Sequence, residues 1–364
     1  MSKVSHPETD YDLTKFSLKG EDLESFNGKY ENLVFEGGGI RGIAFGGVLK
    51  FFEEHDLMHY VKRVAGSSAG AIVAGAIAVN CTADEIIKIL DETNFEDFKD
   101  DSWGLVLDAY RFFNEFGIYK GDKFLEWFKN IVKEKTGNPD ITFKQIYEQY
   151  GKELIITGTC LNRAKTYYFH HEKWPDMPVA LAVRISMSIP LVFKAVRLHT
   201  KEPKLDEDGN TITDEDGNPV MEEFEDIMVD GGLLNNYPIW VFDGESLRDI
   251  DKDTMEHSKT LGFKLMSSDE KPDNQLYHYY QNIGNIIDYM KAFIDSMTIQ
   301  IERGHIRDGY WDKTVSVNTG TISTLDFAIS DKDKQTLIKS GYESAKNHFY
   351  CHLKHIPNEW NNII

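Results

Sequence analysis

Apolar residues in the first part of the chain form short runs that are followed by glycine-rich turns and then by apolar helical segments. Residues 33–35 predict a buried strand that leads through glycine-rich residues 37–42 into a helix ending near Phe52. The same order returns at residues 60–65, where a second strand precedes a glycine–serine turn and a helix to Val79. Two consecutive strand–turn–helix units predict a parallel sheet with helices packed on its faces.

The patterns beyond residue 80 continue this mixture of helices and strands. Thr82 and Glu85 have the spacing of a capping box before a helix to Leu90. A helix over residues 177–189 is expected to stop at Pro190. Further strands are predicted at residues 154–160, 166–170, 193–199, 224–229 and 261–266 and near Val315, and further helices within residues 108–135, 276–307 and 331–354.

Residues 201–223 differ in composition from the segments around them. They contain the sequence Asp-Glu-Asp-Gly-Asn twice, at residues 206–210 and 214–218. Asp-Gly steps between strand-like residues favour hairpin turns, so an acidic, solvent-exposed hairpin insert is expected. Calcium binding is the alternative, but neither copy keeps the glycine and glutamate spacing of an EF-hand loop.

The 364 residues carry 60 acidic and 40 basic side chains, which gives a formal net charge of −20. This charge repels nucleic acid and anionic membrane surfaces at long range, so an anionic partner has to be met locally. No apolar run reaches the roughly 18 residues of a membrane-spanning helix, and residues 1–30 lack the apolar core of a secretory signal. We therefore expect a cytoplasmic protein with a polar arm over residues 1–30 and one domain over residues 31–355. The three cysteines are too widely spaced for a disulfide framework.

The second turn has the form Gly66-x-Ser68-x-Gly70 between a predicted strand and a predicted helix, which is the pattern of a nucleophile elbow. Small flanking residues allow a sharp turn that exposes the serine hydroxyl. Ser68 would then precede a helix N-terminus, where free N–H groups stabilise developing negative charge. A plain tight turn is the alternative interpretation, and the pentapeptide alone does not decide between them.

The first turn also has two interpretations. Gly37-x-Gly39-x-x-Gly42 fits the glycine fingerprint of a dinucleotide site, but the second strand runs into the serine turn without the acidic residue that would hold a ribose. The other interpretation is an oxyanion hole. The amides of Gly37, Gly38 and Gly39 would approach the oxyanion of an acyl transfer closely, and Arg41 would add positive potential.

Asp230-Gly231-Gly232 follows an apolar run, which places a carboxylate at the end of a predicted strand. Taken alone, such an aspartate is more often a turn residue. The two glycines permit close packing behind it, and the other two motifs give it a function, because a carboxylate at this position could reach Ser68.

These three motifs, in this order, resemble the signatures of the patatin-like phospholipase family. The resemblance extends from about residue 31 to residue 352 and includes residues 117–128, the Ser188-x-Pro190 step and residues 324–327. It implies an α/β fold with three α/β/α layers around a central, mostly parallel sheet. It also implies no cofactor and no metal. Glu36 stands where many members have aspartate.

The resemblance further implies a serine lipid acyl hydrolase of the phospholipase A type, with a membrane lipid as a substrate that is met peripherally. Ser68 would be the nucleophile, Asp230 the only base, and Gly37, Gly38 and Gly39 with Arg41 would surround the oxyanion. Whether an activator of protein or small-molecule type is needed stays open, as does delivery of the protein into another cell. No nucleic acid partner is expected.

Two other functions are compatible with the sequence. An esterase of the α/β-hydrolase type would use Ser68 with an acid and a histidine, for which His257, His278 and His305 are candidates. A lipid-binding protein without turnover is the second alternative, although the intact Ser68 and Asp230 argue against it.

Two clusters have a structural and a functional interpretation. His348, His352 and His355 share one helix face beside Cys351 and could bind a metal, but a solvent-exposed terminal helix face is favoured. An aromatic-rich region could contact lipid, although core packing is the default. It consists of Trp103, Phe112, Phe113, Phe116, Tyr119, Trp127 and Phe128.

Overall fold

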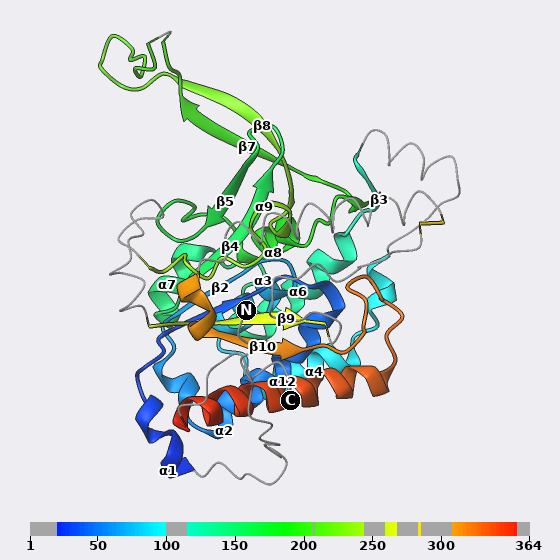
Figure 1. Cartoon of the computed structure of the whole chain (residues 1–364). Helices are drawn as coiled ribbons and strands as arrows, with labels where there is room; N and C mark the ends of the chain where they lie inside the picture. Colours follow the sequence, from blue (N-terminus) through cyan, green and yellow to red (C-terminus); the bar gives the residue numbers. More distant parts are fainter. Residues whose placement is uncertain are drawn as a thin grey trace, which may run out of the picture.

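The computed structural model describes residues 20–99, 115–206, 208–243, 259–267, 283–284 and 308–354. Its central sheet has the strand order β10-β9-β1-β2-β4-β8-β7, with β5 paired to β4 as an additional strand (Figure 1). The strands are β1 (Asn32–Phe35), β2 (Arg63–Gly66), β4 (Glu153–Cys160), β5 (Lys165–Phe169), β7 (Val196–Pro203), β8 (Met221–Asp230), β9 (Thr260–Met266) and β10 (Thr314–Asn318).

The five strands β10, β9, β1, β2 and β4 run parallel, whereas β8 and β5 are antiparallel to β4, and β7 is antiparallel to β8. The predicted α/β class with a central, mostly parallel sheet is therefore confirmed. The helices are α1 (Gly20–Leu23), α2 (Ala44–Glu54), α3 (Ala69–Ala78), α4 (Ala83–Glu92), α6 (Asp122–Thr136), α7 (Phe143–Tyr150), α8 (Val179–Ser186), α9 (Gly232–Asn235) and α12 (Asp331–Leu353).

Successive residues of the central strands alternate between two hydrophobic clusters, one on each face of the sheet. Leu33 and Phe35 belong to the larger cluster, to which α2, α3, α4, α6, α8 and α12 contribute. Val34, which lies between them in β1, belongs to the smaller cluster with residues 237–242 and Tyr310. This alternation follows from the two-residue period of a strand whose two faces are both covered.

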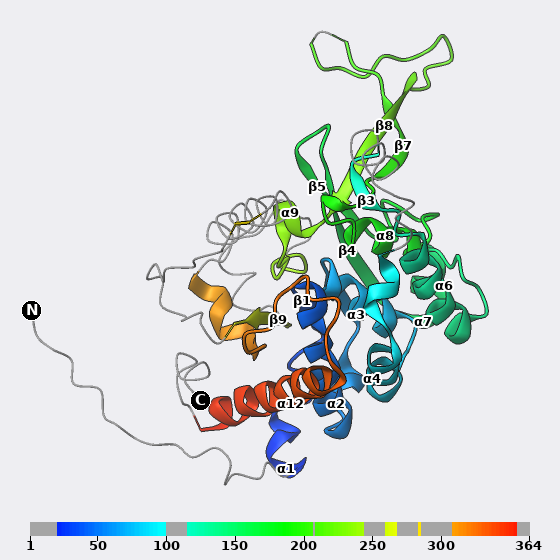
Figure 2. The same cartoon turned by 90° about the vertical axis from the view of Figure 1, so that its right-hand side faces the viewer.

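The helices α2 and α12 pack with their backbones in direct contact, and both views show them side by side (Figures 1 and 2). A Cβ atom added at Gly47 would lie 1.7 Å from the carbonyl oxygen of Ile338, and one added at Gly341 would lie 1.8 Å from that of Ala44. Glycine at both positions is therefore what allows this close approach.

Part of the predicted N-terminal arm belongs to the core. Leu23, Phe26 and Tyr30 are buried, and the Phe26 ring lies 4.8 Å from the Phe349 ring of α12. The expectation of a polar arm up to residue 30 is therefore wrong for these side chains. Their apolar contacts lie far away in the sequence, so no local pattern indicated them.

Most predicted elements are present, and the differences have local causes. The capping box of α4 forms, because Thr82 Oγ1 accepts from the Glu85 amide at 3.2 Å and Glu85 accepts from the Thr82 amide at 2.8 Å. The second strand begins only at Arg63, because residues 57–60 form a 3-10 helix. Residues 276–307, where a long helix is expected, lie outside the described residues apart from 283–284.

The chain around Pro190 also departs from the prediction. The helix α8 ends at Ser186 and not at residue 189, and a short strand β6 (Leu191–Phe193) pairs with β3 (Gly117–Tyr119) in a separate two-stranded sheet. Leu191, the first residue of β6, has a positive φ of 69°. The predicted strand over 193–199 is divided, because β6 ends at Phe193 and β7 begins only at Val196. Residues 115–121 therefore precede α6 as β3 and a turn, not as a helix.

The acidic insert is the tip of a long hairpin formed by β7 and β8, which projects from the body of the protein (Figure 1). Each copy of the repeated sequence closes a tight turn with its first aspartate. Asp206 Oδ1 accepts from the Asp208 and Asn210 amides at 3.0 and 2.8 Å, and Asp214 makes the same pair of contacts in the second copy. The predicted hairpin is confirmed, and these carboxylates stabilise its turns.

Candidate active site

The sheet brings the three glycine motifs together. Phe35 and Gly66 are neighbours in the parallel pair β1 and β2, so the two glycine-rich turns that follow these strands lie side by side. Strand β8 lies on the other side of β4 and runs in the opposite direction, and its last residue, Asp230, pairs with Gly158. A side chain at the end of β8 can therefore reach the turn after β2.

Ser68 and Asp230 are in direct contact. The Ser68 hydroxyl donates to Asp230 Oδ2 at 2.8 Å, and both residues are buried. Ser68 has a φ of 50° and a ψ of −122°, a strained conformation that turns the chain sharply from β2 into α3. Cβ atoms at Gly66 and Gly70 would lie 2.2 Å from backbone oxygens, so both glycines of the pentapeptide are needed for this turn.

The Asp230 carboxylate is held on both sides. Its Oδ1 atom accepts from the Gly232 amide at 2.7 Å, while Oδ2 accepts from Ser68. Burial raises the pKa of Asp230 to about 7, and these two hydrogen bonds oppose the increase only in part. Gly231 packs against Thr157, whose Oγ1 would be 2.1 Å from a Cβ atom at that position. The carboxyl group can therefore take up a proton near neutral pH.

The glycine loop lies against the serine, but its first amide is already used. The Gly37 amide donates to the Asn236 carbonyl at 3.1 Å, and Asn236 Nδ2 donates to the Gly37 carbonyl at 3.1 Å. In this arrangement Gly37 does not offer its N–H to an oxyanion, which corrects the expectation for this residue. Gly37 instead sets the distance to the serine, since a Cβ atom there would lie 2.9 Å from Ser68 Cβ. The amides of Gly38 and Gly39 have no acceptor within the described part of the chain.

Arg41 lies beside this loop. Its Nε and Nη2 atoms would be 3.6 Å from a Cβ atom at Gly38, and Nε is buried without a hydrogen-bond partner among the described residues. An unpaired buried donor on a charged group favours an anionic acceptor nearby. Gly42 permits the start of α3 to approach, because a Cβ atom there would lie 2.6 Å from Ala69 Cβ.

The end of α8 supports both members of the pair, which the sequence did not indicate by any motif of its own. Ser186 Oγ accepts from the Ser68 amide at 2.9 Å, Met187 Sδ lies 3.6 Å from Ser68 Oγ, and the Ser188 carbonyl accepts from the Asp230 amide at 2.8 Å. The Ser188-x-Pro190 step, which is part of the family resemblance, thus has a physical role here, because Ser188 holds the backbone of Asp230.

Arg184 holds the segment of residues 186–188 in place. Its buried guanidinium donates to Ser188 Oγ and to the carbonyl oxygens of Lys120 and Lys194, the latter at 3.1 Å. It also fills the space beside Gly121, which has a φ of 73°. Arg184 therefore connects the Asp230 support to α8 and to the loop before α6.

A buried ion pair anchors the start of the glycine loop. Glu36 Oε1 pairs with Lys264 Nζ of β9, and Glu36 Oε2 accepts from the Leu265 amide at 2.6 Å. The longer side chain that stands here in place of aspartate thus has two defined partners. It ties the residue preceding Gly37 to the neighbouring strand.

The histidines do not take part in this arrangement as far as it is described. His257, His278, His305 and His355 lie outside the described residues. His348 was expected on a solvent-exposed helix face, but it is buried, and burial lowers its pKa to about 3. Within the described ranges no group of three or more histidine, cysteine, aspartate or glutamate side chains could hold a metal ion.

The aromatic-rich region is divided between core and surface. Phe128 is fully buried, and Tyr119 and Trp127 are partly buried against the same hydrophobic cluster, whereas Phe116 is 42% exposed. Trp103, Phe112 and Phe113 lie outside the described residues. No helix in the described part of the chain has the length and apolar character needed to cross a bilayer.

Comparison with known families decides the classification. Residues 33–243, more than half of the chain, match the model of the family described as patatin-like phospholipase. The chain belongs to the patatin-like phospholipase family. This match spans the glycine loop, the serine turn and the Asp-Gly-Gly motif, and it places the protein in a family of lipid hydrolases.

Individual relatives agree with this family. An uncharacterized protein of Acanthamoeba polyphaga mimivirus is 29% identical over 327 residues, which cover 89% of this chain and 95% of the relative. Triacylglycerol lipase 4 of Saccharomyces cerevisiae is 34% identical over 184 residues, which cover 48% of this chain and 19% of the lipase. The crystal structure of VipD from Legionella pneumophila is similar in fold, with a TM-score of 0.52 at 15% identity over 89% of this chain and 67% of VipD.

Proposed function

We propose that the protein hydrolyses fatty-acyl esters of phospholipids or related lipids through a Ser68–Asp230 dyad and an acyl-enzyme intermediate. The observation that carries the proposal is the 2.8 Å hydrogen bond from the Ser68 hydroxyl to Asp230 Oδ2 at the point where the two glycine-rich turns meet. Membership in a family of lipid hydrolases supports the substrate class. The bond is already within the distance that general-base catalysis requires.

In the first step, Ser68 Oγ attacks the ester carbonyl while its proton moves to Asp230 Oδ2. A carboxylate with an ordinary pKa near 3.9 is a poor base for a hydroxyl. Burial raises the pKa of Asp230 to about 7, which strengthens it as a base. The protonated Asp230 then gives this proton to the leaving alcohol as the tetrahedral intermediate collapses to the acyl-enzyme.

The tetrahedral intermediate places a negative charge on the former carbonyl oxygen. The amides of Gly38 and Gly39 and the unpaired Nε of Arg41 are the donors that can meet it. Donors fixed before the reaction stabilise such an oxyanion without reorganisation, and each is worth a few kcal/mol. Gly37 contributes by its small size rather than by its amide.

The second step is hydrolysis of the acyl-enzyme. Asp230 accepts a proton from water, the resulting hydroxide equivalent attacks the acyl carbonyl, and the collapse releases the fatty acid as Ser68 regains the proton from Asp230. One carboxylate thus serves as base and acid in both halves of the cycle. No third residue is needed for the proton balance.

Labelling with a fluorophosphonate probe tests the nucleophile, because the probe reacts with activated serines. We expect labelling of the intact protein, none of the Ser68→Ala variant, and strongly slowed labelling of Asp230→Asn. Lipid product analysis with the same three proteins then reports which ester is cleaved. Labelling that persists in Ser68→Ala would exclude the assignment of the nucleophile.

The histidine-dependent alternative is tested by substituting His257, His278 and His305 one at a time by alanine. A dyad enzyme retains its turnover in each of these variants. A triad enzyme loses most of its turnover in one of them. Loss in a single variant, with normal folding, would replace the dyad by a triad.

A further inference from the structure

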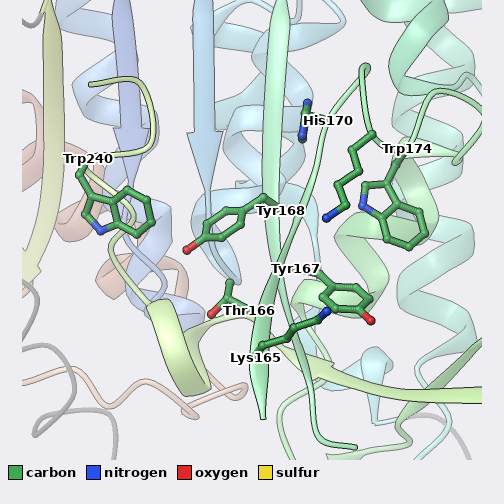
Figure 3. Close-up of a pocket in the computed structure, with 8 residues that line it drawn as sticks. Lys165, Thr166, Tyr167, Tyr168, His170, Trp174 and Trp240 are labelled. Atoms are coloured by element: carbon green, nitrogen blue, oxygen red, sulfur yellow. The ribbon is translucent and has the colours of Figure 1, made fainter. Parts of the chain in front are cut away.

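A cavity lies along β5 and contains no residue of the dyad or of the glycine loop among its lining (Figure 3). Its volume is about 300 Å³, which suits a small ligand or the head of a larger one. In the described sheet β5 pairs with β4 alone, so the cavity follows a strand edge that no other described strand covers.

Two aromatic pairs form the walls of this cavity. Figure 3 shows Tyr168 and Trp240 on one side of β5 and Tyr167 and Trp174 on the other. The ring centroids are 5.7 Å apart in each pair. The lining is therefore apolar on both sides of β5, as expected for a site whose rings lie against the carbon chains of a lipid.

Several donors at this cavity have no acceptor or counter-ion in the described part of the protein. Trp174 Nε1 is buried and has no acceptor, and neither Lys165 nor Lys173 has a carboxylate partner within the described part of the chain. The hydroxyl groups of the two tyrosines are already used, since Tyr167 donates to Asp226 at 2.6 Å and Tyr168 accepts from Asn235 at 2.9 Å. A ligand that satisfies these donors presents acceptors and negative charge.

The cavity is joined to the catalytic loop through two consecutive residues. Asn235 donates to the Tyr168 hydroxyl of the cavity wall, and Asn236 exchanges two hydrogen bonds with Gly37 beside Ser68. A ligand held against Tyr168 is thus only a short segment of chain away from the reaction centre. A lipid headgroup bound in this cavity would therefore bring the lipid surface close to the dyad.

We propose that the cavity along β5 binds the phosphate headgroup of an anionic phospholipid. The phosphate oxygens would meet Lys165, Lys173 and Trp174 Nε1, and the aromatic pairs would contact the adjoining carbon chains. Tryptophan, tyrosine and lysine are the side chains that combine an apolar body with a polar end at membrane interfaces. A net charge of −20 opposes approach to such a surface at long range, so a local site of this kind is what makes the contact favourable.

The inference rests on the proposed lipid hydrolysis for its choice of ligand, and vesicle binding tests it without turnover. The Ser68→Ala protein is mixed with vesicles of phosphatidylcholine alone or of phosphatidylcholine and phosphatidylglycerol in equal parts, and bound protein is measured by co-flotation. We expect binding to the anionic vesicles only. Adding Lys165→Gln and Lys173→Gln should reduce this binding by about tenfold or more, since each lysine near an anionic surface contributes measurably to the affinity.

A matched control separates the site from overall charge. Lys332→Gln with Lys339→Gln removes two exposed lysines of α12, and we expect it to leave vesicle binding unchanged. Trp174→Phe keeps an aromatic ring but removes the unpaired N–H, and a several-fold weakening is expected. Equal loss in the control pair and the cavity pair, or no loss in the cavity pair, would overturn the proposal.

Two further measurements distinguish the ligand source and the proposed function. Release of bound protein by low concentrations of inorganic phosphate would overturn the lipid assignment in favour of a site for free phosphate. Hydrolysis of a soluble short-chain ester by protein with an intact Ser68 reports the dyad alone, so it should be the same with and without the two lysine substitutions. Failure of that hydrolysis in both proteins contradicts the proposed function and leaves the vesicle result to be judged separately.

Discussion

The backbone amide of Asp230 donates to the carbonyl oxygen of Ser188 at 2.8 Å. The hydroxyl of Ser186, two residues before Ser188, accepts from the Ser68 amide. The end of α8 and the residues that follow it therefore hold the nucleophile and its base together. Arg184 fixes this segment by donating to Ser188 Oγ and to two carbonyl oxygens. The separation of Ser68 and Asp230 therefore depends on a residue that touches neither of them.

The first prediction concerns Arg184 as a positioning residue. Arg184→Gln should lower kcat by about 10- to 100-fold with little change in KM, because misplacement of reacting groups by about 1 Å is sufficient for losses of this size. The apparent pKa of the base in the kcat profile should shift as well, and Arg184→Lys should restore part of the rate. Arg197→Gln, an exposed arginine paired with Glu225, is the matched control. A rate loss explained entirely by a smaller folded fraction, with an unchanged pH profile, would contradict the positioning role.

The second prediction is the pH dependence of the reaction. Asp230 must be deprotonated to accept the Ser68 proton, and burial raises its pKa to about 7. Since the base form is lost below this pKa, kcat/KM should fall about tenfold for each pH unit below about 7. The measurement is the initial rate on a soluble ester across this range. An activity that stays constant down to pH values near 4 would argue against Asp230 as the base.

The third prediction is that Asp230 reduces the stability of the folded protein. A carboxyl whose pKa rises from 3.8 to about 7 on folding disfavours the folded state once the pH exceeds both values. The full shift corresponds to about 4 kcal/mol, and we expect Asp230→Asn to raise the free energy of unfolding by roughly 2 kcal/mol at pH 8. This gain should shrink as the pH falls from about 7 toward about 4. Denaturant titrations at several pH values measure it, with the exposed Asp312→Asn as control.

The fourth prediction concerns Arg41. Removing its buried, unpaired donor in Arg41→Gln should lower kcat by about 10²-fold, as for the loss of one oxyanion donor, while the protein stays folded. Arg41→Lys should recover part of this loss, because it keeps the charge but not the geometry of the guanidinium. Steady-state kinetics with the soluble ester measure both variants. A rise in KM alone would instead place Arg41 in substrate binding.

The fifth prediction concerns His348. Burial lowers its pKa from 6.5 to about 3, so the folded state excludes a proton that the unfolded chain binds below about pH 6.5. Above that pH the neutral His348 does not lower the free energy of unfolding. As the pH falls from about 6.5 toward 3, the free energy of unfolding decreases progressively. His348→Leu should therefore gain stability relative to the unmodified protein between pH 6 and about 4. His59→Leu, an exposed position, should show no such trend in the same thermal unfolding series.

The parts of the fold that could be predicted are those with local signals. The strand, glycine turn and helix around Gly66 and Gly70 follow from apolar runs and from glycines that steric contact requires, and the parallel sheet follows from two such units in succession. The capping box at Thr82 is equally local. Each of these depends on residues no more than a few positions apart.

The parts that could not be predicted depend on distant partners. The Asn236 carbonyl, 199 residues away in the sequence, accepts from the Gly37 amide. The glycine motif alone could therefore not show that one of its three amides already has an acceptor. The sequence around Arg184 predicts only a helix. Its positioning role depends on hydrogen bonds to Ser188 and Lys194, which form only in the folded protein. His348 has the spacing of an exposed helix face, yet Phe26 from the predicted N-terminal arm covers that end of α12.

The paired glycines between α2 and α12 have a consequence for biosynthesis. The α2 backbone at Gly47 packs against the α12 backbone at Ile338, which is synthesised long after α2. During translation the face of α2 that contacts α12 stays uncovered until residues 331–353 have been made, and until then it is exposed to other chains. Ribosome-bound chains that stop short of residue 331, where α12 begins, should therefore stay protease-sensitive.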